Sequence, residues 1–195
     1  MKYIKIKGNL VHKSAVLNWN KIIIGKGNII GPYVVIGNSA QHPLSKSMGK
    51  IIIGNENTFN EFCNIHLPTK LKKKTYIGNN NYFMNSTTID HDCTIENDVV
   101  LSSNVTLGGN VYIMNGAQIG MKVSVHQNQI IGSYSMIGMN SFITRKLKVV
   151  PGYKFYGKPA IKKNLNLIGL KRNNINKDLL KIETKRYKKL CISDK

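Results

Sequence analysis

Acidic side chains and cysteines are scarce in this chain of 195 residues. Nine Asp and Glu stand against 29 Lys and Arg, so the formal net charge is +20 at pH 7. The three cysteines, Cys63, Cys93 and Cys191, are too few and odd in number for a disulfide framework, which favours a reducing compartment. The start, MKYIKIKGNLV, never reaches the uninterrupted apolar run of a signal peptide or membrane span. We therefore expect a soluble cytoplasmic protein with no transmembrane segment.

The excess of positive charge suggests anionic partners, and nucleic acid is the first candidate to consider. Most lysines are spread along the chain, and only residues 72–74 and the tail around residues 185–189 are densely basic. No aromatic platform or recognition-helix pattern accompanies them. We therefore expect no nucleic-acid binding. A solvated basic surface, anionic small molecules and an acidic carrier protein remain as explanations.

A period of six residues dominates the middle of the sequence. Aliphatic or aromatic residues occupy every sixth position, at Ile77, Phe83, Ile89, Ile95, Leu101, Leu107, Ile113, Ile119, Val125, Ile131, Ile137 and Ile143. A helix would need a spacing near 3.6 residues, so this strict period excludes one. Six residues form a short strand and a tight corner, and three such sides close a coil of about 18 residues. The pattern predicts an all-β fold, a parallel β-helix of hexapeptide repeats.

The same period extends toward the N-terminus with less regularity. The period includes Ile53, Phe59, Ile65 and, as its weakest member, Leu71. Residues 42–50 are polar and contain Pro and Gly, so they predict an external loop. After Pro151 the repeat stops, and Asn176 is placed to cap an amphipathic helix near the end of the chain. We predict a β-helix over residues 1–150 and an irregular and helical extension over residues 151–195.

Positions one coil apart should lie one above another along an edge of the prism, about 4.8 Å apart. His91, Gly109 and Gln127 share the third position of their hexads in this way. A single histidine at a corner is more often an incidental surface residue, but a histidine can act as a general base beside a glycine amide that stabilises an oxyanion. Cys93 should point inward as a core residue. The histidines lack metal-ligand spacing, so we expect no metal.

Several motifs in the second half carry a family resemblance. The segment IDHDCTIENDVVLSSNVTLGGNVYIMNGAQIGMKVSVHQ, followed by IGSYSMIGMNSF and NLIGLKR, resembles the UDP-N-acetylglucosamine O-acyltransferases of lipid A (lipopolysaccharide) biosynthesis and related hexapeptide-repeat sugar acyltransferases. The resemblance covers roughly residues 75–175. It implies a left-handed parallel β-helix and a homotrimer with active sites between subunits. The left hand rests on the resemblance alone, since general chirality favours right-handed parallel crossovers.

The resemblance also implies roles for individual residues. His91 would be the general base that deprotonates the sugar hydroxyl, and Gly109 would stabilise the oxyanion through its N–H. The implied substrate contacts are His66, Asn110, His126, Gln127, Asn166 and Arg172. The chain departs from the family near Gln41 and His42, where an acidic residue thought to orient the catalytic histidine is missing. The residue that orients His91 is therefore left open.

A further departure concerns the length of the acyl group. Met139 stands where long-chain members of the family tend to have glycine, and Met121 lies one coil earlier in the same column. Two stacked thioether side chains would fill space that a long alkyl tail needs, so we expect a short or medium acyl chain.

The most direct interpretation is an acyltransferase without a tightly bound cofactor, which moves an acyl group from an acyl carrier protein thioester to the hydroxyl of a UDP-N-acetylglucosamine-like sugar nucleotide. One alternative is an N-acetyltransferase that uses acetyl-CoA on a nucleotide-linked amino sugar. Another, from a different class, is a non-catalytic β-helix scaffold. The missing acidic partner of His91 is the main support for the scaffold.

Overall fold

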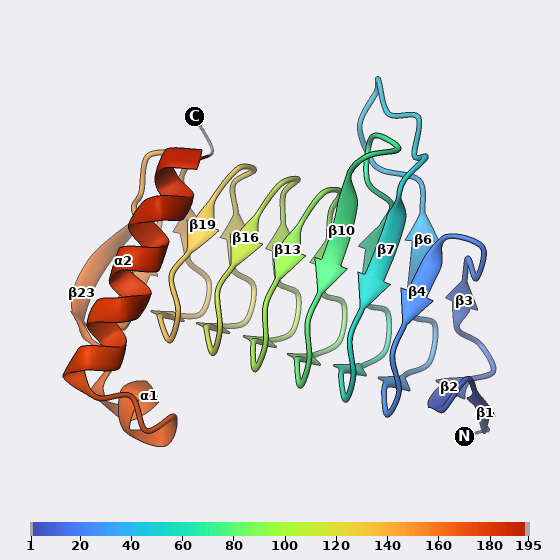
Figure 1. Ribbon diagram of the computed structural model, residues 1–195, viewed down its shortest axis with the longest axis horizontal. Helices are drawn as coiled ribbons and strands as arrows, with labels where there is room; N and C mark the ends of the chain where they lie inside the picture. Colours follow the sequence, from blue (N-terminus) through green and yellow to red (C-terminus); the bar gives the residue numbers. More distant parts are fainter. Residues whose placement is uncertain (1, 194–195) are drawn as a thin grey trace.

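The computed structural model describes residues 2–193 and shows a three-sided prism of stacked coils (Figure 1). The chain winds along the prism from its N-terminal end, and a helix covers the opposite end. In the middle of the prism each coil gives one short strand to each of three sheets, whose strands pair in parallel along the long axis. The predicted all-β fold, a parallel β-helix with a short C-terminal helical segment, is confirmed.

The three sheets form the three faces of the prism. The first face contains β1 (Tyr3–Ile6), β2 (Asn9–His12), β5 (Ile29–Ile30), β8 (Thr58–Phe59), β11 (Tyr82–Phe83), β14 (Val100–Leu101), β17 (Gln118–Ile119), β20 (Met136–Ile137), β22 (Tyr153–Gly157) and β23 (Ala160–Leu165). The second contains β3 (Val16–Leu17), β6 (Val35–Asn38), β9 (Asn64–His66), β12 (Thr88–Ile89), β15 (Thr106–Leu107), β18 (Ser124–Val125) and β21 (Phe142–Ile143). The third contains β4 (Ile22–Ile24), β7 (Lys50–Ile53), β10 (Lys74–Ile77), β13 (Thr94–Ile95), β16 (Tyr112–Ile113) and β19 (Ile130–Ile131). Two helices follow, α1 (Leu167–Arg172) and α2 (Lys177–Ser193).

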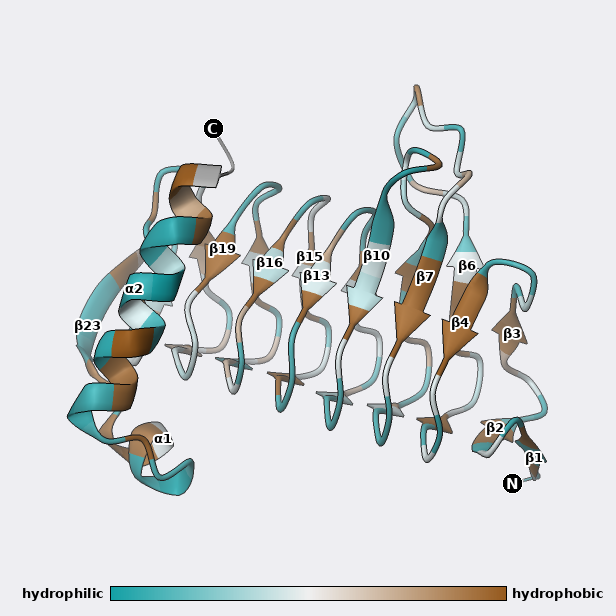
Figure 2. Ribbon diagram, in the orientation of Figure 1, coloured by the Kyte–Doolittle hydropathy of each residue, from teal (hydrophilic) through white to brown (hydrophobic). Residues whose placement is uncertain are grey.

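Strand pairing in the middle of the prism follows the six-residue period. On the second face, Ile89 pairs with Leu107, which pairs in turn with Val125, so each anchor meets the one three hexads later. The predicted anchors from Ile77 to Ile143 are all buried in the core. Figure 2 shows hydrophobic residues on strands such as β7 and β19, with hydrophilic residues in the corners below them. Burying each aliphatic anchor stabilises the prism by about 1.5–3 kcal/mol.

One extra residue in a corner near the N-terminus shifts the six-residue period of the preceding part of the chain by one position. Leu17 pairs with Ile36, one residue more than a regular coil requires. The N–H of Lys21 donates to the carbonyl of Asn18 at 2.8 Å and closes this longer corner. The strands therefore stay in register, although the sequence period is shifted by one.

Two loops leave the prism at the edge between the second and third faces. The first loop, residues 39–49, connects β6 to β7, and the second loop, residues 67–73, connects β9 to β10. They lie against each other, since the N–H of Lys46 donates to the carbonyl of Thr69 at 3.3 Å. Leu71 lies in the second loop and is 67% exposed, so the weakest predicted anchor is not part of the core. The predicted loop at residues 42–50 is found, except that Lys50 begins β7.

The C-terminal helix α2 packs against the third face. Tyr187 is buried and forms a small apolar cluster with Met114 and Ile130. The guanidinium of Arg186 pairs with the carboxylate of Glu96, which is only 9% exposed. The helix thus covers the C-terminal part of the third face with both apolar and ionic contacts. No helix in residues 2–193 is long and apolar enough to cross a membrane.

The first face continues beyond the predicted end of the repeat. Phe155 in β22 pairs with Ile137 in β20, which preserves the spacing of one coil, and β22 then turns back into the antiparallel strand β23. The predicted boundary at residue 150, between the β-helix and the C-terminal extension, stays a prediction.

Candidate active site

The predicted catalytic residues lie on the edge between the second and third faces. His91, Gly109 and Gln127 follow β12, β15 and β18 at equivalent places, and the pairing of these strands stacks them at about 4.8 Å per coil. The N–H of Asn110 donates to the His91 carbonyl, and the N–H of Asn128 donates to the Gly109 carbonyl, both at 2.9 Å. The column expected from the sequence is therefore present.

The imidazole of His91 lies directly against Gly109. A Cβ built on Gly109 would be 2.3 Å from Cε1 and 2.5 Å from Nε2 of His91. Any side chain at this position would collide with the ring, so the ring can occupy this space only because the residue is glycine. Within residues 2–193, the Gly109 N–H donates to no protein acceptor. An unpaired donor and a histidine nitrogen therefore share one corner.

Asp92 contacts the other side of the imidazole. Its Oδ2 is 2.9 Å from Nδ1 of His91. Thr69, in the second loop, donates to the same carboxylate through its hydroxyl at 2.8 Å and its N–H at 3.2 Å. An ionised carboxylate only accepts hydrogen bonds, so this partner places a proton on Nδ1 and leaves the lone pair on Nε2. The free nitrogen is the one that faces Gly109.

The environment of Asp92 keeps its carboxylate ionised. Burial, with 3% of the side chain exposed, acts to raise the pKa. The hydrogen bonds from Thr69 and His91 and the charge of Lys73, whose Nζ is 3.5 Å from Oδ2, outweigh burial and hold the pKa of Asp92 below its usual value. The backbone of Asp92 has φ of 62°, a region in which Asp and Asn are enriched. This corner conformation brings the carboxylate beside the preceding histidine.

A pocket of about 310 Å³ opens in front of His91 and is walled by the two loops. Its lining residues are His42, Leu44, Thr69, Lys70, Lys73, His91, Asp92 and Asn110. The ring of His42, in the first loop, lies edge-on to the ring of His91 with centroids 5.6 Å apart. The side chain of His91 is 9% exposed, so the pocket reaches only part of the ring.

His66 lies beside this site but does not line the pocket. Its side chain is 2% exposed, and Nδ1 is 3.2 Å from Oδ1 of Asp90, close enough for an ion pair but not aligned for a hydrogen bond. The same Asp90 oxygen accepts the N–H of His91 at 2.8 Å. Burial lowers the pKa of His66, although the charge of Asp90 opposes this. His66 therefore lies beside Asp90 in the single chain, and its role as a substrate contact stays a prediction.

Three other predicted contact residues lie on the same edge. Asn110 lines the pocket, and its Oδ1 accepts a hydrogen bond from Nζ of Lys73 at 2.9 Å. Gln127 is exposed in the coil after Gly109, and Nδ1 of His126 is 2.9 Å from the carbonyl oxygen of Gln127. These side chains extend the site along the prism.

Four predicted residues lie on other edges. The side chain of Asn166 caps α1 by accepting the N–H of Gly169 at 3.2 Å, and Arg172 is exposed at the end of the same helix. Met121 and Met139 stack on the edge that follows the first face, where they are 46% and 66% exposed. A single chain therefore does not bring these four residues to His91.

The buried thiol beside the histidine has no nucleophilic character. Cys93 is fully buried, as predicted, and burial raises its pKa to about 12. Its Sγ lies 3.3 Å from the carbonyl oxygen of Gly108. Within residues 2–193 there is no group of three or more His, Cys, Asp or Glu side chains that could hold a metal ion.

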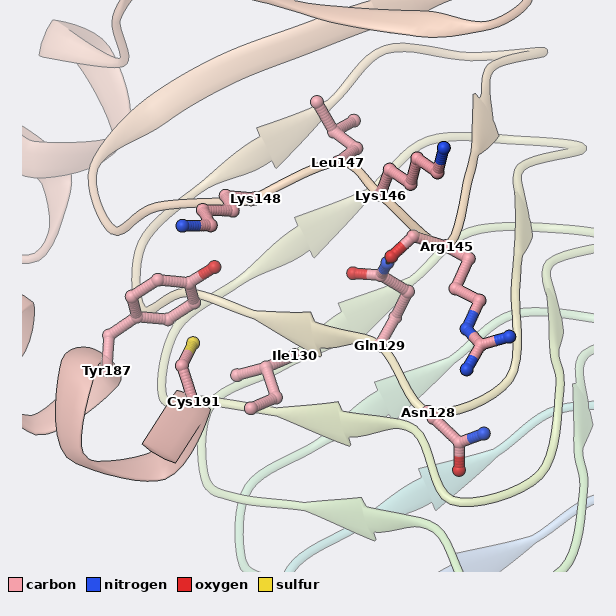
Figure 3. A pocket seen from close by; sticks show the side chains of 9 residues that line it. All are labelled: Asn128, Gln129, Ile130, Arg145, Lys146, Leu147, Lys148, Tyr187 and Cys191. Atoms are coloured by element: carbon pink, nitrogen blue, oxygen red, sulfur yellow. The ribbon is translucent and has the colours of Figure 1, made fainter. Parts of the chain in front are cut away.

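A second pocket, of about 340 Å³, lies farther along the prism under α2 (Figure 3). Arg145, Lys146 and Lys148 supply its positive charges, while Tyr187 and Cys191 approach from the helix. Arg145 comes one coil after Gln127 and so continues the column that begins at His91. This edge of the prism is therefore basic at both ends.

The sequence has relatives among known acyltransferases. Residues 74–109 match the family model described as bacterial transferase hexapeptide (six repeats). A probable mitochondrial acyl-acyl-carrier-protein:UDP-N-acetylglucosamine O-acyltransferase of Arabidopsis thaliana is 38% identical over 173 residues, 87% of this chain and 51% of the relative. The enzyme with the corresponding name from Gloeothece citriformis is 36% identical over 154 residues, 78% of this chain and 55% of the relative. The chain thus spans about half the length of these relatives.

The same class of enzyme is found among similar solved structures. The UDP-N-acetylglucosamine acyltransferase of Bacteroides fragilis 9343 superposes with a TM-score of 0.82 at 27% identity, covering 92% of this chain and 69% of that one. The Arabidopsis enzyme gives 0.72 at 28% identity, covering 87% and 78%. The chain is a hexapeptide-repeat protein similar to UDP-N-acetylglucosamine O-acyltransferases. The predicted resemblance and the left-handed parallel β-helix that it implied are confirmed.

For this hexapeptide-repeat protein, sequence reasoning missed the partner of His91, the predicted general base. The sequence has no acidic residue near His42, and the structure instead places the carboxylate of Asp92 beside Nδ1 of His91. The signal was present in the HDC motif, because Asp92 occupies the corner position at which Asn and Asp recur along the chain. Lys73 and Thr69, which hold Asp92, lie in a loop that interrupts the repeat and carries no periodic signal.

Proposed function

We propose that the protein is an acyltransferase that moves an acyl group from an acyl carrier protein thioester to a hydroxyl of UDP-N-acetylglucosamine or a closely related sugar nucleotide. The observation that carries this proposal is the arrangement of Asp92, His91 and Gly109 at one corner, with the free histidine nitrogen under the glycine. The donor and the acceptor follow the names of the similar enzymes. No tightly bound cofactor takes part in this reaction.

In the first step, Nε2 of His91 accepts the proton of the sugar hydroxyl while the oxygen attacks the thioester carbonyl. Asp92 keeps the other ring proton on Nδ1 and stabilises the imidazolium that forms, as a buried carboxylate does in other histidine-dependent acyl transfers. The new C–O bond converts the carbonyl into a tetrahedral oxyanion. The unpaired N–H of Gly109 is the donor we assign to that oxyanion, and losing one such donor typically costs 10²–10³-fold in rate.

In the second step, the tetrahedral intermediate collapses and the C–S bond breaks. The leaving thiolate takes the proton from the imidazolium, which returns His91 to its starting state. The products are an O-acylated sugar nucleotide and the free thiol of the carrier. Asn110, Gln127 and His126 lie along the same edge. In this proposal they contact the substrates on either side of the reacting atoms.

The complete site requires more than one chain in this proposal. Met121, Met139, Asn166 and Arg172 lie on other edges of the prism, and rotation into a homotrimer would set one subunit's edge against another's His91. Asn166 and Arg172 would then contact the nucleotide, while the two exposed methionines would end the acyl groove. The proposal therefore includes a short or medium acyl chain, and Met139→Gly should shift the preference toward longer chains.

The decisive experiment is mass spectrometry of the product formed by the purified protein. UDP-N-acetylglucosamine and a 3-amino analogue would each be offered with acyl carrier protein loaded with chains of 2 to 14 carbons, and with acetyl-CoA. The proposal predicts an ester on the hydroxyl sugar, made from the carrier-bound donor and lost in His91→Ala. An amide formed only from acetyl-CoA would favour the N-acetyltransferase. Absence of product from every pair, with unchanged ligand binding in His91→Ala, would favour the scaffold.

A further inference from the structure

The pocket in front of His91 carries positive charge that the binding of a neutral sugar would not require. Lys70 and Lys73 both line it. The carboxylate among its lining residues belongs to Asp92, which is 3% exposed and already engaged by Thr69 and His91. A substrate entering the pocket therefore meets ammonium groups without an open carboxylate beside them.

The two lysines differ in how firmly they are held. Nζ of Lys73 is 2.9 Å from Oδ1 of Asn110 and 3.5 Å from Oδ2 of Asp92, so its charge is fixed close to the histidine. The ammonium group of Lys70 makes no hydrogen bond or ion pair with any described residue, yet Lys70 lies on the pocket wall. Its charge is thus free to pair with a ligand. The ring of His42 adds a further polar group on the opposite loop.

A lysine-rich loop is often no more than a solvated surface, and the second loop contains a built-in comparison. Lys72 does not line the pocket, and neither does Lys74, the first residue of β10, whose Nζ lies over the ring of Tyr76 at 5.1 Å. Thr69 anchors the loop to Asp92, and Lys70 and Lys73 in this anchored segment line the same pocket as His91. The second loop thus has two lysines that line the pocket, Lys70 and Lys73, and one, Lys72, that does not.

We propose that Lys70, Lys73 and His42 form an anion-binding subsite, which takes a carboxylate or phosphate of the acceptor next to the hydroxyl that His91 deprotonates. This deepens the proposed function by assigning the acceptor a negative group close to the acylated position. Two sources share this chemistry, a carboxylate on the sugar ring, as in a uronic acid, and the diphosphate of the nucleotide. A hydrogen bond between charged groups is roughly twice as strong as a neutral one, so the subsite gives the acidic ligand a clear advantage.

The test is equilibrium binding by titration calorimetry, with UDP-N-acetylglucosamine, UDP-N-acetylglucosaminuronic acid and uncharged N-acetylglucosamine as probes. We expect Lys70→Gln to weaken binding of an anionic probe by about tenfold or more. Two variants are matched controls, Lys72→Gln in the same loop and Lys146→Gln in the second pocket. Each should change binding by less than about twofold.

The pattern of losses distinguishes the sources. A loss confined to the uronic acid supports a ring carboxylate, and equal losses for both nucleotide sugars support the diphosphate. Unchanged binding in Lys70→Gln, the same loss in Lys146→Gln, or no binding of either nucleotide sugar by the unmodified protein overturns the subsite. The titration contains no acyl donor, so a protein that binds these sugars but transfers no acyl group would refute the proposed function while leaving the subsite in place.

Discussion

Replacing Gly109 with alanine should lower both the rate of acyl transfer and the stability of the fold. Both losses would come from one contact, between the new Cβ and the ring of His91. The added Cβ would lie 2.3 Å from Cε1 of His91, and its three nearest atoms are all in that ring. An ordinary carbon contact is about 3.5 Å, so the ring must retreat by roughly 1 Å. A displacement of about 1 Å at a catalytic group lowers the rate by roughly 10²-fold, which corresponds to about 2.7 kcal/mol in the activation barrier. Overpacking of this kind destabilises the fold by about 1–3 kcal/mol.

A double-mutant cycle with His91→Ala isolates this contact from any other effect of the alanine. Urea unfolding would be followed for the unmodified protein, each single variant and the double variant. Removing the ring removes the three atoms nearest to the new Cβ, so Gly109→Ala should cost at least about 1 kcal/mol less in the His91→Ala background. Equal costs in both backgrounds would mean that the ring does not lie against Gly109, and the catalytic arrangement would be refuted without any activity measurement.

Three further predictions concern the groups around the site and the end of the prism. Asp92→Asn should lower kcat by about 10²–10⁴-fold in a steady-state assay while KM changes little, because the amide no longer holds the required tautomer. Burial lowers the pKa of His66 in the folded chain, so acidification favours the unfolded state; urea unfolding should show stability falling from pH 7.5 to pH 5.5, with a smaller fall in His66→Gln. Glu96→Gln should cost about 1–2 kcal/mol in urea unfolding and speed amide exchange in α2, since Arg186 loses one of its two counter-charges and keeps only the carboxylate of Glu183, 3.2 Å away. An unchanged kcat in Asp92→Asn would contradict the first prediction. The same fall in stability with pH in His66→Gln and in the unmodified protein would contradict the second, and unaltered amide exchange in α2 of Glu96→Gln would contradict the third.

The repetitive part of the molecule is the part that sequence reasoning predicted. Each coil repeats the same strand and corner, so a spacing of three hexads is enough to stack His91 and Gly109 on one edge. The same spacing of three hexads stacks Met121 and Met139 on another edge. Period alone, however, does not say which edges would meet in the proposed homotrimer, so the relation between the two columns could not be derived.

The parts that break the period carry the information that the sequence did not reveal. Asp92 contacts His91 because its backbone adopts a left-handed conformation, which a hexad pattern does not specify. Lys73 reaches Asp92 from a loop that leaves the prism, and its position depends on packing between two irregular segments. The pairing of Arg186 with Glu96 joins residues 90 positions apart through the docking of α2. Contacts of this kind depend on tertiary structure and leave no local signal.

The most direct test of the account is the rate of acyl transfer from a loaded acyl carrier protein to UDP-N-acetylglucosamine or its uronic acid, measured for the unmodified protein and for His91→Asn. General-base catalysis by a histidine typically contributes about 10²–10⁴-fold. The account predicts a loss of kcat within that range in His91→Asn, with acceptor binding retained. Turnover by His91→Asn at a rate close to that of the unmodified protein would contradict the assignment of His91 as the base.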